Sequence, residues 1–301
     1  MNKTVFAHIS LFFANLIYAI NYTFAKDVMP DFIQPSGFIL LRVIGAVILF
    51  SIFYFVFVRE KVQAQDLMRL AICGIFGVAI NQLLFFEGLN LTTPINAAII
   101  LTTNPVLVII ISFFILKESI TFRKGLGITL GIIGAAALIL NGGNFSGNAN
   151  FMLGNLFVFL NALSYGLYLV LVKPLMQKYH PITVMFYVFS FGLCCVLPFG
   201  YYELGIVDFS SFPLKIIWKV LFVVVCTTFI AYFLNSVALQ KLNPSTVSIY
   251  IYLQPVLASA FAIAVGSDAL DMNKIIAASI VFIGVYLVSV RPLKSRKQKL
   301  S

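Results

Sequence analysis

The chain carries a long internal repeat. Residues 94–141 align with residues 244–291 at a constant offset of 150, without a gap. Two prolines match in this run, Pro94 with Pro244 and Pro105 with Pro255. An acid, a lysine and a glycine match as well, in the pairs Glu118 and Asp268, Lys124 and Lys274, and Gly134 and Gly284. Chance does not produce such a run, so we expect two similar halves.

A weaker sequence match precedes this run and extends the duplication toward the start of the chain. At an offset of 146, Asn15 matches Asn161, Tyr22 matches Tyr168, and Pro35 matches Pro181. Residues 141–150 between the two copies are rich in Gly and Asn, which is typical of a flexible connection. We therefore divide the chain into a first repeat (1–143), a linker (144–150) and a second repeat with a short basic tail (151–301).

Composition excludes a soluble globule. The chain is 61% hydrophobic and 10% charged, whereas soluble domains carry about 25% charged residues. Apolar runs of about 20 residues can cross a bilayer as helices, and the sequence has ten, near 5–25, 36–58, 67–88, 94–116, 123–141, 152–173, 182–202, 215–238, 244–266 and 273–290. The first run lacks a small-residue cleavage site and reads as a helix, not a signal peptide.

Five helices in each half make the two repeats inverted, because an odd number places the second copy in the opposite orientation. The loop 117–124 contains three positive charges, whereas its copy, 267–274, contains two acids and one lysine. A loop that changes sides of the membrane is expected to lose positive charge. The sequence thus predicts an all-α membrane protein of ten transmembrane helices in two inverted five-helix repeats.

The distribution of basic residues predicts the orientation. Fifteen Lys and Arg fall in the loops and tail on the side of the N-terminus, and four fall in the loops of the other side. The positive-inside rule then predicts a multi-pass protein of the cell membrane with both termini in the cytoplasm. The net charge of +10 is explained by this topology, so we expect contact with anionic membrane lipids and no nucleic-acid partner.

Several segments together resemble a known family. They are Tyr18–Lys26 and Phe38–Arg42, the run Asn104–Glu118, and the glycines Gly127, Gly131 and Gly134, with the pattern repeated over 154–173 and 244–284. In this combination the chain resembles the EamA family of the drug/metabolite transporter superfamily over essentially its whole length. It departs from the family pattern at Lys117, where a Gly usually precedes the Glu, and at Tyr18-Ala19, where Trp-Gly is usual. The resemblance implies a ten-helix transporter, usually an exporter of small metabolites, amino acids or drugs.

Polar groups at bilayer depth are costly and often functional, so they are the first candidates for a substrate site. Asn104-Pro105 and Gln254-Pro255 occupy matching positions near the middle of the fourth and ninth runs. Proline frees a backbone carbonyl one turn earlier, which with the neighbouring amide makes a polar spot at the repeat interface. Alternatively, Pro105 and Pro255 are structural kinks that let neighbouring helices pack, and the two interpretations are compatible.

Two repeat-related stripes add further candidates. Asn15, Tyr18 and Tyr22 share one face of the first helix, and Asn161, Tyr165 and Tyr168 form the matching stripe on the sixth. Tyrosine combines an apolar ring with a hydroxyl, which suits a pocket for amphipathic solutes. Ordinary helix packing is the alternative.

Two charges have no charged copy in the other repeat. Arg42 matches Val188 and Glu87 matches Val237. We expect such charges to bind a zwitterionic or anionic solute or to form a gate. The alternatives are a static ion pair or, for Arg42, hydrogen bonds to helix-end carbonyls. Asn81 is also included in the proposed substrate site, with Gln82 and Asn235 as secondary candidates, whereas Glu118 is expected to fix the turn between the fourth and fifth helices.

The remaining residue patterns argue against chemistry. Four cysteines lie in apolar runs without metal-ligand spacing, two histidines are isolated, and no phosphate-binding Gly-x-x-x-x-Gly-Lys-Ser/Thr loop is present. We expect no enzyme, no metal and no cofactor. The sequence predicts a secondary transporter, an exporter of small metabolites, amino acids or drug-like solutes by alternating access, as a monomer or a homodimer. A lipid or glycolipid translocator of the same fold is the alternative, and the coupling ion stays open.

Overall fold

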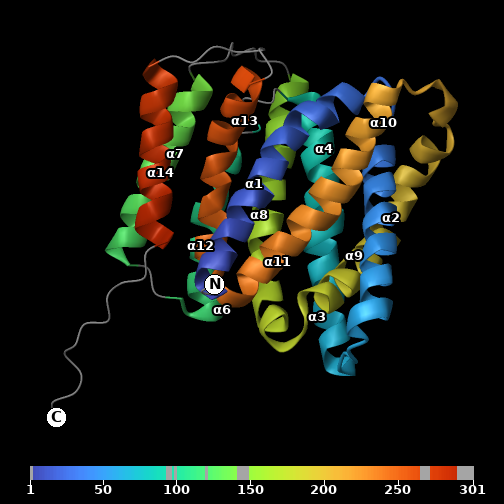
Figure 1. The fold of residues 1–301 in the computed structure, drawn as a ribbon, viewed down its shortest axis with the longest axis horizontal. Helices are drawn as coiled ribbons and strands as arrows, with labels where there is room; N and C mark the ends of the chain where they lie inside the picture. The colour runs from blue at the N-terminus through green and yellow to red at the C-terminus, as the bar shows by residue number, and fades with distance from the viewer. Residues whose placement is uncertain are drawn as a thin grey trace.

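The computed structural model describes residues 3–92, 97, 100–118, 121–140, 149–264 and 272–289. Within these ranges every regular element is a helix (Figure 1), which confirms the all-α prediction. Pro94 and Asp268, most of the linker and the basic tail lie outside the described residues, as does the side chain of Lys274.

The first half is a series of helices interrupted by short π-helical segments. In order it contains α1 (Lys3–Val28), α2 (Pro35–Phe53), η1 (Tyr54–Val58), α3 (Ala64–Gly74), η2 (Ile75–Ile80), α4 (Asn81–Leu91), α6 (Asn104–Leu116) and α7 (Phe122–Leu140). Pro35 lies in the first turn of α2, where its missing N–H costs nothing. Lys117, with a φ of 54°, ends α6 in the left-handed region.

The second half repeats this order of helices. It contains α8 (Ala149–Lys178), α9 (Pro181–Gly205), η3 (Phe209–Ser211), α10 (Leu214–Leu221), η4 (Phe222–Ile230), α11 (Ala231–Lys241), α12 (Pro244–Ile249), η5 (Tyr250–Tyr252), α13 (Leu253–Ala264) and α14 (Met272–Ser289). The π-helical segments η2 and η4 occupy corresponding places in the two halves. The first lies between α3 and α4, and the second lies between α10 and α11.

Within the described residues, six helices are long and apolar enough to cross a membrane. They span Thr4–Val28, Pro35–Val58, Ala64–Leu91, Met152–Lys178, Pro181–Gly205 and Leu214–Lys241. These correspond to six of the ten apolar runs. Of the other four, α7 and α14 have 19 and 18 residues, α6 has 13, and the ninth run is divided into α12, η5 and α13. Ten spans therefore stay a prediction.

Both predicted proline positions lie just after a break in a helix. Pro105 is in the first turn of α6, which follows a turn at Thr102 and Thr103. Pro255 is in the first turn of α13, which follows the 3₁₀ segment η5. Proline is tolerated in a first turn because the N–H groups there have no intrahelical partner. The breaks leave Asn104 and Gln254 at the starts of new helices.

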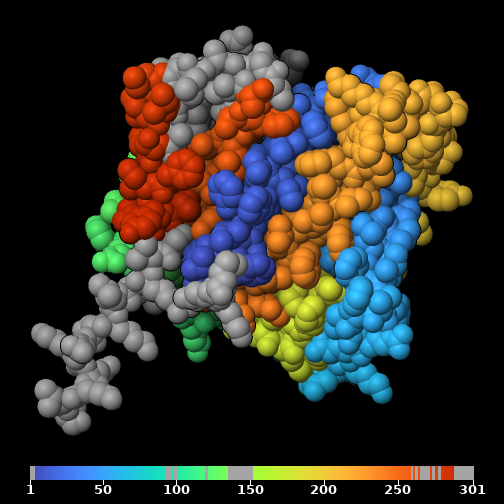
Figure 2. Space-filling view, viewed as in Figure 1, coloured from blue at the N-terminus to red at the C-terminus, as the bar shows by residue number. Residues whose placement is uncertain are grey.

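The helices pack in reciprocal pairs across the two halves. The contact of α4 with α8 has its counterpart in α11 with α1, and that of α6 with α8 in α13 with α1. Likewise η2 packs on α9 as η4 packs on α2, while α2 with α9 and α7 with α14 pair equivalent helices. Figure 2 shows α1 on one face of the molecule, between α11 and α13. The sequence repeat is thus also a repeat of packing.

Glycines let several of these pairs approach closely. A Cβ at Gly284 of α14 would lie 2.7 Å from the carbonyl oxygen of Gly127 in α7, and one at Gly74 of α3 would lie 2.7 Å from the carbonyl oxygen of Val188 in α9. Small residues have this role where helices associate without a hydrophobic driving force.

One end of the molecule gathers the N-terminal end of α1, the end of α6 and the start of α12, at the lower edge of Figure 1. We call this end the N-terminal face.

Candidate functional site

A central cavity is lined by both halves of the chain. Its volume is about 120 Å³. Nine of the eleven residues proposed from the sequence line it, namely Asn15, Tyr18, Tyr22, Arg42, Asn81, Asn104, Asn161, Tyr165 and Gln254. The two secondary candidates, Gln82 and Asn235, line it as well.

Two proposed residues lie outside the lining. Glu87 is half-buried and accepts a hydrogen bond of 2.7 Å from the Ser36 hydroxyl. Tyr168 is buried against Gly77 of η2, where an added Cβ would lie 2.3 Å from the tyrosine ring. Its hydroxyl is 3.9 Å from the Met185 sulfur. The stripe on α8 therefore divides, with Asn161 and Tyr165 facing the cavity and Tyr168 packed between helices.

A three-residue network joins α1 to α13 at the cavity wall. The Gln254 side-chain amide donates to Asn15 Oδ1 at 2.9 Å, and the Tyr22 hydroxyl donates to Gln254 Oε1 at 2.9 Å. Asn15 Nδ2 in turn donates to the carbonyl of Leu11 at 2.8 Å. Gln254 is thereby satisfied at both ends, so it orients α1 more than it offers groups to a solute.

Asparagines join α8 to α4 and α6 in the same way. Asn161 Nδ2 donates to the backbone carbonyl of Asn81 at 2.6 Å, and Asn104 Nδ2 donates to the carbonyl of Ala162 at 2.7 Å. Asn104 and Gln254 are repeat-equivalent, and each donates to the equivalent helix, α8 or α1. Polar side chains commonly link helices in this manner within a membrane.

Arg42 is a buried cation with no carboxylate partner in the described part of the chain. Its side chain is 3% exposed, its Nε donates to Thr228 Oγ1 at 3.0 Å, and its guanidinium carbon lies 4.6 Å from the centroid of the Phe86 ring. The described ion pairs involve other residues, so Arg42 and Glu87 do not pair there. A buried, unneutralised guanidinium is costly and favours an anionic ligand.

Five polar atoms of the cavity residues have no hydrogen-bond partner. They are Asn21 Oδ1, Arg42 Nη1, Gln82 Oε1, Asn104 Oδ1 and Thr227 Oγ1. Buried polar atoms normally find partners, and each exception asks for an explanation. One cationic donor, three amide acceptors and one hydroxyl thus belong to residues that line one cavity. The described lining contains no Asp or Glu, and the described residues contain no cluster of His, Cys, Asp or Glu arranged for a metal.

The sequence reasoning missed several lining residues. Asn21 follows Tyr18 by three positions on the same face of α1, so the helical spacing could have found it. Thr227 lies in an apolar run beside Thr228, and a threonine in such a helix usually bonds its own backbone, as Thr228 does with the carbonyl of Val223. Tyr232 and Phe86 carry no signal that separates them from the many aromatic residues of the core.

Comparison with known proteins assigns the chain. The model of the EamA-like transporter family matches residues 5–140 and again residues 152–290. The uncharacterised transporter YyaM of Bacillus subtilis (strain 168) is 25% identical over 252 residues, with 81% of this chain and 80% of that protein covered. The uncharacterised transporter YetK of the same organism is 24% identical over 301 residues, with 97% and 89% covered.

Two further likenesses extend this result. A protein of Streptantibioticus cattleyicolor named "Probable terminal-alkyne amino-acid exporter" is 22% identical, with 79% of this chain and 78% of that protein covered. A crystal structure aligns with a TM-score of 0.75 at 18% identity, covering 93% of this chain and 95% of the other, which shows a shared fold. With its apolar helices and its two family matches, this chain is a multi-pass membrane protein that belongs to the EamA-like transporter family.

Proposed function

We propose that this protein is a secondary transporter that exports small zwitterionic solutes, amino-acid-like in chemistry, by alternating access. The observation that supports this most is the set of unpartnered groups on cavity-lining residues, a buried guanidinium nitrogen and three amide oxygens. A cation that lacks a carboxylate partner and acceptors that lack donors are complementary to a solute that carries both a carboxylate and an ammonium group.

The roles follow from the donor and acceptor types. Arg42 would bind the carboxylate through its free Nη1, since guanidinium–carboxylate bonds are charge-assisted and strong. The oxygens of Asn21, Gln82 and Asn104 would accept from the ammonium group. Tyr18, whose ring lies edge-on 6.3 Å from a second tyrosine ring, would contact the apolar part of the solute.

The transport cycle needs the predicted topology. We infer ten transmembrane helices in two inverted repeats, in the cell membrane and with both termini in the cytoplasm, surrounded by lipid as a monomer or a homodimer. The reciprocal packing of equivalent helices supports the inverted repeat, and the basic residues concentrated on the side of the N-terminus support the orientation. Repeats that rock about a shared midplane site are the usual basis of alternating access. The relative named as an amino-acid exporter favours export and this class of solute.

The test is a thermal-stability screen of the purified protein beside the Arg42→Ala variant. The panel contains amino acids, their carboxylate-only and amine-only analogues, nucleosides, organic cations, sugar phosphates and lipids. A ligand at about 100 times its Kd stabilises the folded state by roughly 2.7 kcal/mol. We expect zwitterions to raise the melting temperature, neither half-analogue to match them, and Arg42→Ala to abolish the effect.

Other outcomes of the screen would change the assignment. Stabilisation by organic cations or nucleosides that persists in Arg42→Ala would overturn the role of the guanidinium. Stabilisation by a lipid alone, indifferent to Arg42, would favour a lipid or glycolipid translocator.

A further inference from the structure

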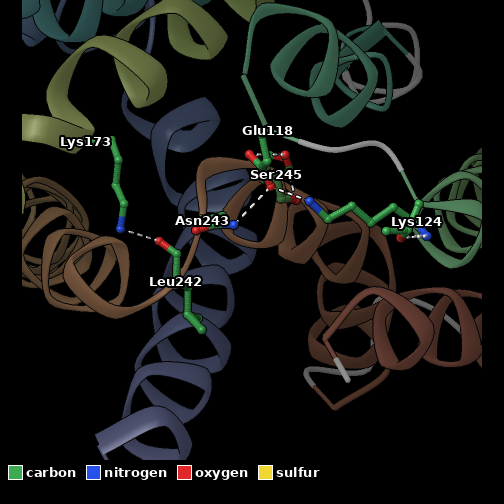
Figure 3. Close-up of polar contacts among 8 residues, drawn as sticks. Glu118, Lys124, Lys173, Leu242, Asn243 and Ser245 are labelled. Carbon is green, nitrogen blue, oxygen red and sulfur yellow. Dashed lines mark hydrogen bonds and ion pairs between the residues drawn. The ribbon is translucent and has the colours of Figure 1, made fainter. Parts of the chain in front are cut away.

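Glu118, next to the turn that follows α6, bonds to the other half of the chain. Its carboxylate accepts a hydrogen bond from the Ser245 hydroxyl at 2.8 Å and from Asn243 Nδ2 at 3.2 Å, and it pairs with Lys124 of α7 (Figure 3). The contact with Lys124 joins the residue that follows α6 to the first turn of α7. The contacts with Asn243 and Ser245 join it to the turn between α11 and α12.

A second side chain holds the α11–α12 turn from the opposite side. Lys173 of α8 is 7% exposed, and its Nζ donates to the carbonyl of Leu239 at 2.6 Å. It also donates to the carbonyl of Leu242 at 2.8 Å (Figure 3). A cation at these carbonyls satisfies the C-terminal end of α11 and complements its dipole. The turn therefore stays fixed to α8, and Glu118 is the attachment that joins it to the α6–α7 turn.

These attachments lie directly below the cavity at the N-terminal face. Val247, which lines the cavity, is two residues beyond Ser245 on α12. Asn104, which also lines it, begins α6. Helices α6 and α12 pack against each other, and each has one of these cavity-lining residues and a residue bonded at the N-terminal face or next to it.

A buried polar residue lies on α6 between the cavity and the N-terminal face. Ser112, between Asn104 and Glu118 along the chain, is 0% exposed, and its hydroxyl has no hydrogen-bond partner. A buried hydroxyl without a partner is unfavourable. In a state in which α6 and α12 separate, water would satisfy it.

Other polar contacts on this face hold different helices. Asp66 of α3 accepts from the Tyr179 hydroxyl at 2.8 Å and pairs with Lys178, and Glu60 accepts from the backbone N–H of His180 at 2.8 Å. They attach the start of α3 to the α8–α9 turn. Neither α3 nor α9 contributes a residue to the cavity lining, so these contacts belong to the surrounding scaffold.

We propose that Glu118 is the latch that closes the transport pathway at the N-terminal face. Its hydrogen bonds to Asn243 and Ser245 hold the α6–α7 turn against the α11–α12 turn. They break when the cavity opens to this face between α6 and α12. The proposal rests on the transport function proposed above, but the closed latch is observable without any substrate.

The test measures the accessibility of a reporter thiol at Ser112. Ser112→Cys is introduced after Cys73, Cys194, Cys195 and Cys226 are replaced by alanine, and its reaction with a water-soluble maleimide is timed in the purified protein. We expect slow labelling with Glu118 in place and a roughly tenfold faster rate in Glu118→Ala, which loses hydrogen bonds to a charged acceptor. Ser245→Ala, which removes one donor, should give a smaller increase.

Glu60→Ala is the matched control, because it removes a carboxylate bond between the two halves on the same face without touching α6 or α12. Unchanged labelling in Glu118→Ala and Ser245→Ala, with normal melting and a monodisperse profile, would overturn the latch. An equal increase in Glu60→Ala would overturn it too, because the face would then loosen as a whole. If Glu118→Ala does not fold, Glu118→Gln and Ser245→Ala decide by the same measurement. A negative ligand screen with faster labelling would count against the proposed substrate alone.

Discussion

Helices α1 and α8 occupy equivalent places, since α1 packs on α11 and α13 as α8 packs on α4 and α6. On α1, all three residues of the repeated stripe line the cavity, and the Tyr22 hydroxyl bonds to Gln254. On α8, the counterpart of Tyr22 is Tyr168, which is buried against Gly77 of η2. The residue that meets each tyrosine, an amide in one half and a glycine in the other, decides whether it joins the site. Duplication thus preserves the packing of helices, while single neighbours decide the chemistry.

The equivalent helices α2 and α9 also differ in chemistry, here by one charged residue. These equivalent helices pack on each other, but Arg42 of α2 has Val188 as its counterpart in α9. The cavity therefore carries its cation on one side only. Under the function proposed above, this asymmetry would give a zwitterion one preferred orientation, with its carboxylate at α2.

The strongest test of this comparison between the halves uses variants of the equivalent pair Asn104 and Gln254. Asn104→Ala should abolish flux in proteoliposomes, because it removes an unpartnered acceptor from the cavity, while the protein still inserts and remains monodisperse. Gln254→Ala should instead lower the melting temperature, because it leaves Asn15 Oδ1 and the Tyr22 hydroxyl without partners, at about 1–3 kcal/mol for each unsatisfied group.

Flux and melting temperature are measured on both variants. Normal flux in Asn104→Ala would remove this residue from the site. Equal losses of flux with equal melting temperatures would show that the two amides act alike, and that the unpartnered oxygen does not distinguish them.

The cavity could be anticipated from the sequence where polar residues stand in apolar helices. Asn15, Asn104 and Arg42 had no favourable place except the interior, because lipid cannot satisfy them. The burial of Tyr168 between helices could not be predicted from the sequence, because it depends on Gly77 in η2 and on the rotation of α8 against η2. The partner of Glu87 could not be predicted either, because Ser36 lies on another helix, α2.

A second prediction concerns the part of the molecule where the halves still match, the pair α7 and α14. Gly284→Ala should lower the free energy of unfolding by about 1–3 kcal/mol, as overpacking does, since the new Cβ would lie 2.7 Å from the carbonyl oxygen of Gly127 and 2.9 Å from the N of Gly131. These are backbone atoms that cannot rotate away. Melting in detergent measures the effect.

Gly125→Ala in α7 is the control for helix propensity. No atom lies within 4 Å of a Cβ there, so this variant should be stabilised by up to about 1 kcal/mol. Equal melting temperatures for the two variants would mean that α7 and α14 can separate slightly at little cost.

The smallest expected effect tests the two tyrosines from which the comparison began. Tyr22→Phe and Tyr168→Phe remove the same hydroxyl from equivalent positions. Tyr22→Phe loses its bond to Gln254 and a polar group of the cavity wall, so ligand affinity should fall roughly threefold to tenfold, the effect of one hydrogen bond. Tyr168→Phe loses only a 3.9 Å contact with sulfur, and its affinity should equal that of the unchanged protein.

The ligand found in the stability screen serves for both titrations, and the melting temperature without ligand shows whether either change acts through folding. Equal losses of affinity would mean that the stripe of α8 reaches the solute as that of α1 does, so that the halves would be equivalent at the site as well as in the scaffold. A loss confined to Tyr22→Phe would place the asymmetry in the neighbours of the two tyrosines, Gln254 at Tyr22 and Gly77 and Met185 at Tyr168, because the helices and the substitution are otherwise matched.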